Sequence, residues 1–376
     1  MKSLGLYIHI PFCQKKCNYC DFYSKEVNDE AFKSKYIDAL CLQIEREAEQ
    51  YKNHIVDTIF FGGGTPSLIK SKDMEKLMLC IKKCLRVDEN AEISIEINPK
   101  TVDYEKLKAY KKIGINRISI GLQSTDDEML KCLGRIHSYN DFLSTYKLVR
   151  EAGFDNVSVD LMYGLPNQTV TMLQDTLSKI LCLDIEHISL YLLKIEEKTY
   201  FGKIKNRLYL PDDDTEYEMY IKMCELLEEN GYSQYEISNF SKEGKRSRHN
   251  LKYWLSDEYI GLGPNAHSYF EKRRFSYKAD TTAYINELLN GGLPEKISEE
   301  QIECISEIDE YVMLKLRLSD GIELCQFKNR FDIELTDKYP SIMKYVKSGH
   351  MKLENGKCYF TRQGFFVSNY ILSDIL

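Results

Sequence analysis

The sequence predicts an α/β fold, a partial barrel of about six strand–helix units followed by a small, mainly helical C-terminal domain. Three observations predict it. Short apolar strands and helix-forming segments alternate through the first 200 residues, which is typical of βαβ units around a parallel sheet. A cysteine loop, a run of three glycines and several polar residues follow the ends of the predicted strands. Beyond residue 201 the alternation stops, and an aromatic segment leads into helices.

Each predicted element has a local reason. Residues 5–10 form an apolar run suited to a strand, and residues 30–51 are rich in Ala, Leu, Ile, Glu and Arg, which favour a helix. The apolar run 56–61 ends at Gly62-Gly63-Gly64, and a helix follows over 72–85. The alternation continues with strands over 91–97, 116–120, 156–161 and 187–193 and helices over 104–113, 126–133, 139–152 and 170–181. Six units are fewer than the eight of a closed barrel, so we expect a partial one.

The remainder follows a different pattern. A helix is expected over 216–229, where Asn230-Gly231 ends it. Residues 231–267 are aromatic and rich in Gly, Ser and Asn, and we expect them to be irregular. Helices should dominate from Thr281, with a short hairpin near Cys358. The run from Asn290 to Pro294 breaks the pattern. We therefore predict a barrel over 1–200, an extension over 201–285 and a helical domain over 286–376.

The residues that follow the predicted strands indicate where the site lies. A cysteine loop follows the first strand and the three glycines follow the second. Glu96, Gln123 and Asp160 lie at the ends of the third, fourth and fifth strands. Barrels and open parallel sheets both bind ligands at the carboxyl ends of their strands. One rim of the barrel is therefore the expected functional site.

Composition excludes several classes of protein. Apolar residues make up 43% of the 376 residues and charged residues 29%, an ordinary globular balance. The net charge of −7 and the sequence pI of about 5.7 lack the basic field of a nucleic-acid binder. No stretch reaches the roughly 18 apolar residues of a membrane span, and Met1 to Phe12 resembles a strand more than a signal peptide. We expect a cytoplasmic protein, with transient membrane association and oligomeric state left open.

Only one group of the twelve cysteines is dense. Cys13, Cys17 and Cys20 form C-x3-C-x2-C, whereas the others are scattered and are expected to be small buried side chains. Three thiolates can hold three irons of a [4Fe–4S] cluster and leave the fourth iron open to a small molecule. Lys15 and Lys16 would favour the thiolates. The alternatives are a zinc site completed by His9 or by a remote ligand, and chance clustering.

The motifs around this loop carry a resemblance to a known family. Tyr7-Ile-His-Ile-Pro-Phe-Cys13 through Cys20 resembles the opening of radical S-adenosylmethionine (SAM) enzymes of the coproporphyrinogen dehydrogenase group, and the resemblance extends over nearly the whole chain. Gly62-Gly63-Gly64-Thr65-Pro66 is similar to the element that receives the SAM amino group. The resemblance implies a radical SAM-type barrel and these SAM-binding residues: Tyr7, Tyr19, Gly63, Gly64, Thr65, Glu96, Gln123, Arg135 and Asp160. In this family Arg135 would face the SAM carboxylate, and Asp160 would bind ribose.

Within the group the chain resembles HemW-type heme chaperones. The dehydrogenase has a further cysteine two residues after the third, where this sequence has Phe22, and a long extension before the barrel, whereas the first strand here begins near Met1. His249-Asn-Leu-Lys-Tyr-Trp254 matches the H-N-x-x-Y-W pattern of HemW. That resemblance makes His249 the expected heme-binding residue, with Lys245, Arg246 and Arg248 facing propionates and Tyr253 and Trp254 against the porphyrin. His267 is a further candidate, although a hydrogen-bonded loop histidine explains it equally well.

The sequence therefore predicts a radical SAM-type heme chaperone that binds a [4Fe–4S] cluster, SAM and heme, and delivers heme to cytochromes or respiratory enzymes. The alternatives are an oxygen-independent coproporphyrinogen III dehydrogenase, which decarboxylates two propionates to give protoporphyrinogen IX, and a heme-opening radical SAM methyltransferase. Whether SAM is cleaved, and so whether the protein is an enzyme, stays open at this point. An enzyme of this group would be an oxidoreductase acting on coproporphyrinogen III.

Overall fold

A computed structural model describes residues 1–301 and 304–376 of the chain. It confirms the α/β fold and the six predicted strands, with ends shifted by a few residues. These strands are β1 (Lys2–Ile10), β4 (His54–Gly63), β5 (Val87–Ile97), β6 (Arg117–Gln123), β7 (Val157–Tyr163) and β8 (His187–Leu192). They run parallel in this order across the sheet. Their near-continuous burial is expected of a parallel sheet that is covered on both faces.

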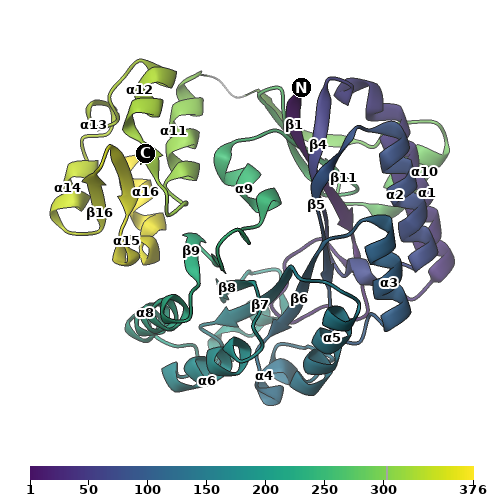
Figure 1. Cartoon of the computed structure of the whole chain (residues 1–376), viewed down its shortest axis with the longest axis horizontal. Helices are drawn as coiled ribbons and strands as arrows, with labels where there is room; N and C mark the ends of the chain where they lie inside the picture. Colours follow the sequence, from purple (N-terminus) through teal and green to yellow (C-terminus); the bar gives the residue numbers. More distant parts are fainter. Residues whose placement is uncertain (302–303) are drawn as a thin grey trace.

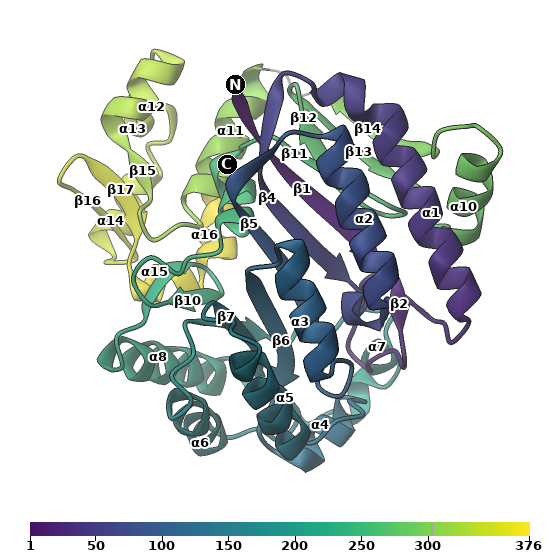
Figure 2. The ribbon, with the colours of Figure 1, turned by 45° about the vertical axis from the view of Figure 1, so that its right-hand side comes forward.

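Helices between these strands cover the outer face of the curved sheet (Figure 1, Figure 2). They are α1 (Glu30–Glu47), α2 (Ser71–Cys84), α3 (Tyr104–Ile113), α4 (Asp127–Cys132), α5 (Tyr139–Glu151) and α6 (Val170–Leu181), with 3-10 turns at Ala48–Tyr51 and Pro66–Leu68. Local signals fix where they begin. The Asp29 carboxylate accepts from the backbone N–H groups of Ala31 and Phe32, and Ser138 and Asp141 form a reciprocal capping box.

Residues 231–267 were expected to be irregular, and this prediction is wrong. They contain β9 (Ser233–Glu236), β10 (Asn239–Ser241), α9 (Arg248–Leu255), β11 (Tyr259–Leu262) and the start of β12 (His267–Phe270). These strands extend the sheet on both sides, in the order β14-β13-β12-β11-β1-β4-β5-β6-β7-β8-β10-β9. β11 pairs with β1 in parallel and is a seventh parallel strand. β13 (Arg273–Tyr277) and β14 (Lys296–Gln301) complete this side of the sheet, and β14 lies beyond residue 285. The predicted division of the chain into three regions stays a prediction.

The remaining elements complete the barrel wall and form a small C-terminal unit, visible in yellow and light green (Figure 1). Two short strands lie near the cysteine loop, β2 (Phe12–Cys13) and β3 (Lys25–Glu26). The edge of the barrel is lined by α7 (Tyr200–Lys203), a 3-10 turn (Lys205–Arg207), α8 (Asp213–Glu229) and α10 (Thr281–Leu289). The C-terminal unit contains α11 (Cys304–Lys315), β15 (Ile322–Glu323), α12 (Leu324–Phe331), α13 (Leu335–Lys338), α14 (Ile342–Lys347), β16 (Met351–Glu354), β17 (Lys357–Phe360), α15 (Arg362–Phe366) and α16 (Ser368–Ile375). β16 and β17 form the predicted hairpin.

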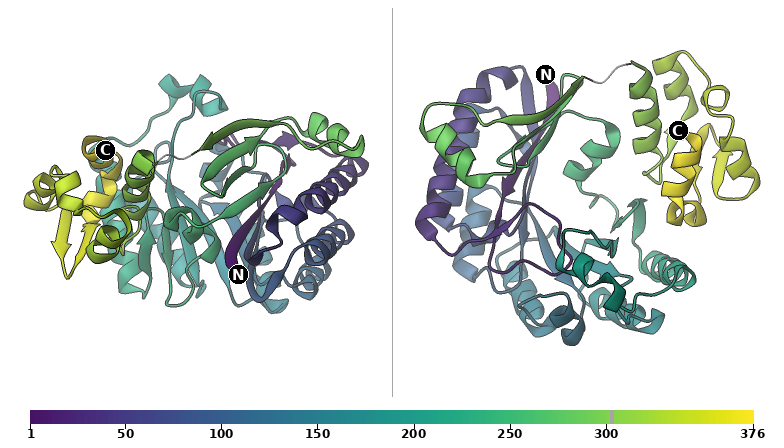
Figure 3. Two further views of the ribbon diagram at one scale, coloured as in Figure 1. Left: turned by 90° about the horizontal axis from the view of Figure 1, so that it is seen from above. Right: turned by 180° about the vertical axis from the view of Figure 1, so that it is seen from behind.

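The C-terminal unit packs beside α8, α9 and β9 (Figure 3). The Ser319 N–H donates to the Tyr235 carbonyl at 3.1 Å, and Arg246 forms a 2.8 Å ion pair with Asp320. The guanidinium of Arg317 lies 6.0 Å from the Trp254 ring centroid. These contacts hold α9 between the barrel and the C-terminal unit.

In the part of the chain that the structure describes, no helix is both long and apolar enough to cross a membrane.

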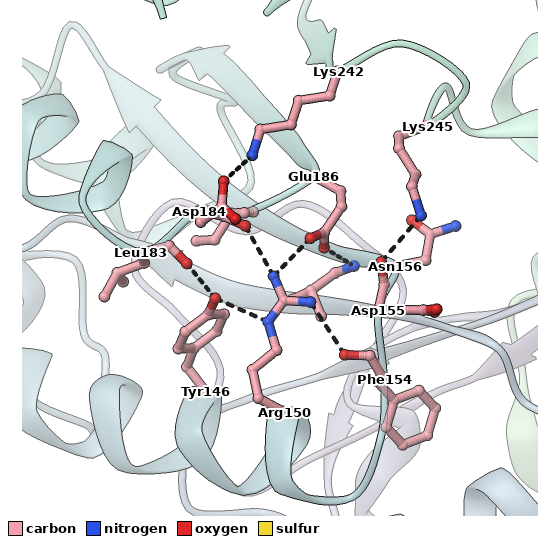
Figure 4. Close-up of polar contacts among 12 residues, drawn as sticks. Tyr146, Arg150, Phe154, Asp155, Asn156, Leu183, Asp184, Glu186, Lys242 and Lys245 are labelled. Carbon is pink, nitrogen blue, oxygen red and sulfur yellow. Dashed lines mark hydrogen bonds and ion pairs between the residues drawn. The ribbon is translucent and has the colours of Figure 1, made fainter. Parts of the chain in front are cut away.

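A polar network joins the barrel's helices and strands at the end where the strands begin (Figure 4). Arg150 of α5 donates to the carbonyls of Phe154 and Asp184, each at 3.1 Å, and to the Glu186 carboxylate at 2.8 Å. Glu186 in turn accepts from the Val157 N–H, the first residue of β7, at 2.9 Å. Contacts at the amino ends of barrel strands stabilise the fold, whereas chemistry lies at the opposite rim.

Candidate functional site

The cysteine loop lies at the carboxyl end of β1, where the sequence predicted it. Cys13, Cys17 and Cys20 are half-buried and line a cavity of about 740 Å³. Burial raises the pKa of Cys13, and it raises the pKa of Cys20 to about 11. These thiols therefore ionise readily only beside a metal or another cation. The donor set fits a group that binds thiolates.

Two observations favour an iron–sulfur cluster over a single zinc ion. The sulfurs of the loop are not among the described groups of three ligand atoms that lie within 4.8 Å of one another. At least one pair of these sulfurs is therefore more than 4.8 Å apart, which suits thiolates that bind three different irons. His9, the suggested fourth zinc ligand, has both ring nitrogens engaged, one 2.8 Å from the Tyr23 carbonyl and the other 3.1 Å from the Tyr7 hydroxyl.

The glycine run after β4 brings that strand against the cysteine loop. The Gly64 and Thr65 N–H groups donate to the carbonyls of Ile10 and Phe12 at 2.8 and 2.7 Å. A Cβ on Gly64 would lie 2.6 Å from the Phe12 carbonyl oxygen, so only glycine fits. Gly63 has φ +114° and donates its N–H to Glu96 at 3.1 Å. The glycines thus form a backbone cradle directly beside the thiols.

Arg135 connects the cysteine loop to the ends of three strands. Its guanidinium donates to the Cys17 sulfur at 3.5 Å, to the Asn98 amide oxygen at 2.6 Å and to the Gly121 carbonyl at 2.5 Å. Asn98 also donates to the Thr65 hydroxyl at 2.8 Å. A positive charge is thereby fixed next to a thiol and an open cavity, as an anionic or carboxylate-bearing ligand would require.

Two carboxyl groups lie deeper at the same rim. Burial and the charge of nearby Asp160 raise the pKa of Glu96 to about 8. Burial also raises the pKa of Asp160, although the Ser119 hydroxyl donates to both of its oxygens at 3.1 Å. Such a pair is costly to keep ionised in the absence of a ligand, which is typical of a binding site. A cation or hydroxyl donor would relieve that cost.

The cavity brings together most of the predicted SAM residues. Tyr19, Gly63, Gly64, Thr65, Glu96, Gln123, Arg135 and Asp160 all line it. Tyr7 is the exception, because it lies behind the rim and stacks on Phe60 with ring centroids 6.3 Å apart. The volume lies within the ~300–1,000 Å³ range of small-molecule sites.

Sequence reasoning missed several residues of this cavity. Asn98 lies two residues after Glu96, and the period of two along a strand could have identified it. Tyr191 and Lys194 line the cavity at the end of β8, the one predicted strand to which no site residue was assigned. His267, which the sequence had already named as a further candidate, also lines the cavity with an exposed side chain.

The structure separates the predicted heme residues from this cavity. His249 is fully buried on α9, with its ring nitrogens 2.8 Å from the Thr58 and Tyr253 hydroxyls. Its ring stacks on Phe60 at 5.3 Å, and burial lowers its pKa to about 3. The imidazole therefore has no free nitrogen for iron in this arrangement. That His249 binds heme stays a prediction, and in this arrangement its imidazole is buried and hydrogen-bonded on both nitrogens.

The basic residues before His249 also bind partners away from the cavity. Lys245 donates to the Asp155 carbonyl at 3.1 Å (Figure 4), Arg246 pairs with Asp320, and Arg248 donates to the Asn90 carbonyl at 2.8 Å. These partners lie where β5 and β7 begin or in the C-terminal unit. The segment closes the barrel at the end opposite the cavity.

Glu96 should make the free energy of unfolding of the ligand-free protein depend on pH. Its pKa of about 8 in the folded protein lies above its ordinary value of 4.5, so between these pH values the folded state keeps a proton that the unfolded chain has released. The free energy of unfolding should therefore fall as pH rises from about 5 to 8, by up to about 1.4 kcal/mol per pH unit. Glu96→Gln should flatten this slope in urea titrations across the window.

An exposed glutamate of the same strand, Glu89, provides the matched control. Glu89→Gln should keep the slope of the unsubstituted protein. If the pH profiles of Glu96→Gln and the unsubstituted protein are parallel, Glu96 does not hold a proton in the folded state.

Two regions match known families. Residues 7–180 match the Radical SAM superfamily, and residues 306–367 match the HemN C-terminal domain. The heme chaperone HemW of Bacillus subtilis is 36% identical over 380 residues, which cover 100% of this chain and 99% of that protein. The heme chaperone HemW of Escherichia coli is 36% identical over 329 residues, covering 87% and 86%.

A solved structure has the same fold. Coproporphyrinogen III oxidase (HemN) from Escherichia coli, described as a radical SAM enzyme, superposes with a TM-score of 0.87 over 100% of this chain and 90% of that one. Sequence identity in this comparison is 20%. The partial barrel and its small C-terminal domain are therefore those of the radical SAM fold.

Proposed function

Because the chain belongs to the family of the heme chaperone HemW within the radical SAM superfamily, we propose that it binds a [4Fe–4S] cluster, SAM and heme and delivers heme to acceptor proteins in the cytoplasm. The observation that carries this proposal is the 36% identity to HemW along the whole chain, against 20% to the coproporphyrinogen enzyme of the same fold. Cytochromes and respiratory enzymes are the proposed acceptors.

The cavity residues support the binding of the first two groups. Cys13, Cys17 and Cys20 would hold the cluster, which when bound supplies an electron and an open iron for the amino-acid end of SAM. Arg135 would orient the SAM carboxylate. The ionised forms of Glu96 and Asp160 would accept from ammonium or ribose hydroxyl groups. The backbone cradle of Gly63 and Gly64 would exclude water beside the thiols.

Heme binding needs an accessible ligand. His249, the residue that the H-N-x-x-Y-W resemblance suggests, would bind iron only after α9 moved and its two hydrogen bonds broke. His267 needs no such change, because its side chain is exposed at the cavity. We therefore propose His267 as the alternative axial ligand in the resting protein.

A second function has one specific observation in its favour. The fold and C-terminal domain match those of coproporphyrinogen III oxidase, so oxidative decarboxylation of coproporphyrinogen III is the competing activity. Its catalytic core would use the same cavity.

One experiment separates these functions. The cluster is assembled without oxygen, and the protein is incubated with coproporphyrinogen III, SAM and a reductant, with the E. coli oxidase as the positive control. We expect no protoporphyrinogen IX, and in parallel we expect stoichiometric heme binding and transfer of unchanged heme to an apo-cytochrome. Sustained turnover would make the protein a dehydrogenase. Consumption of heme with release of iron would make it a heme-opening methyltransferase.

A further inference from the structure

A second group of thiols lies outside the site described above, on two adjacent helices of the outer layer. Cys41 and Glu45 are one turn apart on α1, and Cys80 and Cys84 are one turn apart on α2. The two helices lie side by side (Figure 2). Residues four apart on a helix share one face, so each helix presents two ligands toward the other.

Three of the four proposed ligand atoms are already close together. One carboxylate oxygen of Glu45 and the sulfurs of Cys80 and Cys84 all lie within 4.8 Å of one another. The Cys80 sulfur also lies 3.6 Å from the Cys41 carbonyl oxygen, so Cys41 is a neighbour of Cys80. In a tetrahedral site with Zn–S bonds of about 2.3 Å, neighbouring ligand atoms are about 3.8 Å apart. Small side-chain rotations would therefore bring the atoms of Glu45, Cys80 and Cys84 to bonding distance, and the Cys41 sulfur would have to turn toward them from outside this group.

The surroundings suit a cation. Glu45 lies in the last turn of α1 and Cys84 is the last residue of α2. The carbonyl ends of both helices carry partial negative charge, which favours a positive ion there. Cys41 and Cys80 are 8% and 9% exposed, whereas Glu45 is exposed, so the group is protected on one side and open to an entering ion on the other.

We propose that Cys41, Glu45, Cys80 and Cys84 bind one thiophilic divalent cation, zinc, in a site separate from the [4Fe–4S] loop. Three sulfurs and one oxygen are a ligand set that selects zinc over hard cations such as magnesium. The helices run antiparallel to the strands, so the last turns of α1 and α2 lie at the end of the barrel opposite the cysteine loop. The ion joins the two helices and stabilises the first part of the barrel.

The test uses the full chain with its cluster assembled under reducing, oxygen-free conditions. After incubation with zinc and removal of unbound metal, iron and zinc are measured per chain, and zinc X-ray absorption reports the ligands. We expect one zinc per chain with three sulfur ligands and one oxygen ligand. Glu45→Gln and Cys84→Ser should lower zinc affinity by more than about 10-fold, because even indirect partners contribute that much. Cys182→Ser, an exposed cysteine on another helix, should have no effect.

Two further measurements keep the test decisive. Thermal melting without zinc shows whether Glu45→Gln and Cys84→Ser fold normally, and added zinc should raise the melting temperature only where the site is intact. The combined Cys13→Ala, Cys17→Ala and Cys20→Ala variant should keep its zinc. Loss of zinc from that variant, retention of zinc by Cys84→Ser, or absence of zinc from the unsubstituted chain would each overturn the proposal.

Discussion

Replacing Cys17 with alanine is expected to abolish assembly of the [4Fe–4S] cluster. In the proposed cluster site the side chain would supply one of three thiolates, and it is the one to which the Arg135 guanidinium donates at 3.5 Å. Without it, one iron loses its protein ligand and the buried guanidinium loses a partner. Iron and acid-labile sulfide per chain, and the electron paramagnetic resonance signal after reduction, should fall to background.

The control for this variant is Cys132→Ala. Cys132 is exposed at the end of α4, close to the loop in space, since its carbonyl accepts from the Asn18 side chain at 2.8 Å. Its replacement should leave iron, sulfide and the resonance signal unchanged. A Cys17→Ala protein with a full and spectroscopically unchanged cluster would refute the assignment of the loop.

Replacing His249 with alanine is expected to destabilise the fold by about 3 kcal/mol or more. The change leaves a cavity beside Phe60 and removes the ring nitrogens that lie 2.8 Å from the Thr58 and Tyr253 hydroxyls. Cavities of aromatic size cost about 3–5 kcal/mol, and each unpaired buried polar group adds about 1–3 kcal/mol. Denaturant unfolding of the cluster-free chain measures the loss.

This prediction also decides between two roles for His249. If the residue is structural, the folded fraction of His249→Ala should still bind heme, with an unchanged absorption spectrum. The comparison is His267→Ala. Because the His267 side chain is exposed, this variant should fold normally, and it should lose the heme absorption spectrum. A His249→Ala protein of normal stability that no longer binds heme would instead show that the imidazole reaches the heme.

The shared position of the cysteine loop and of most residues proposed to bind SAM could be predicted, because these residues lie at or after the ends of strands of the parallel core. In that arrangement the sequence position of a residue decides which rim it occupies. Glu96 and Asp160 belong to β5 and β7, far apart along the chain, yet their charges interact because both strands end at the same rim. Asn98 also lies at the end of β5 on this rim. That it links Arg135 to Thr65 was visible only from its hydrogen bonds in the structure.

The position of the segment around His249 could not be predicted in the same way. β11 is only four residues long, and it is fixed by pairing with Gly5–Ile8 at the other end of the chain. Which end of the barrel α9 occupies depends on such remote pairings and on contacts with the C-terminal unit. A local motif carries no information about them, so a histidine that resembles a heme ligand could lie inside the barrel.

The alternation of strands and helices, the cysteine loop and the rim on which the cavity forms all follow from local sequence, because burial pattern, helix caps and glycine turns act over a few residues. The roles of the remote segments depend instead on the three-dimensional arrangement of the chain. This arrangement placed α9 at the closed end of the barrel, gave Arg135 its three partners, and brought the thiols of α1 and α2 within reach of a single ion. These outcomes depend on distances between residues far apart in the chain, which local chemistry does not set.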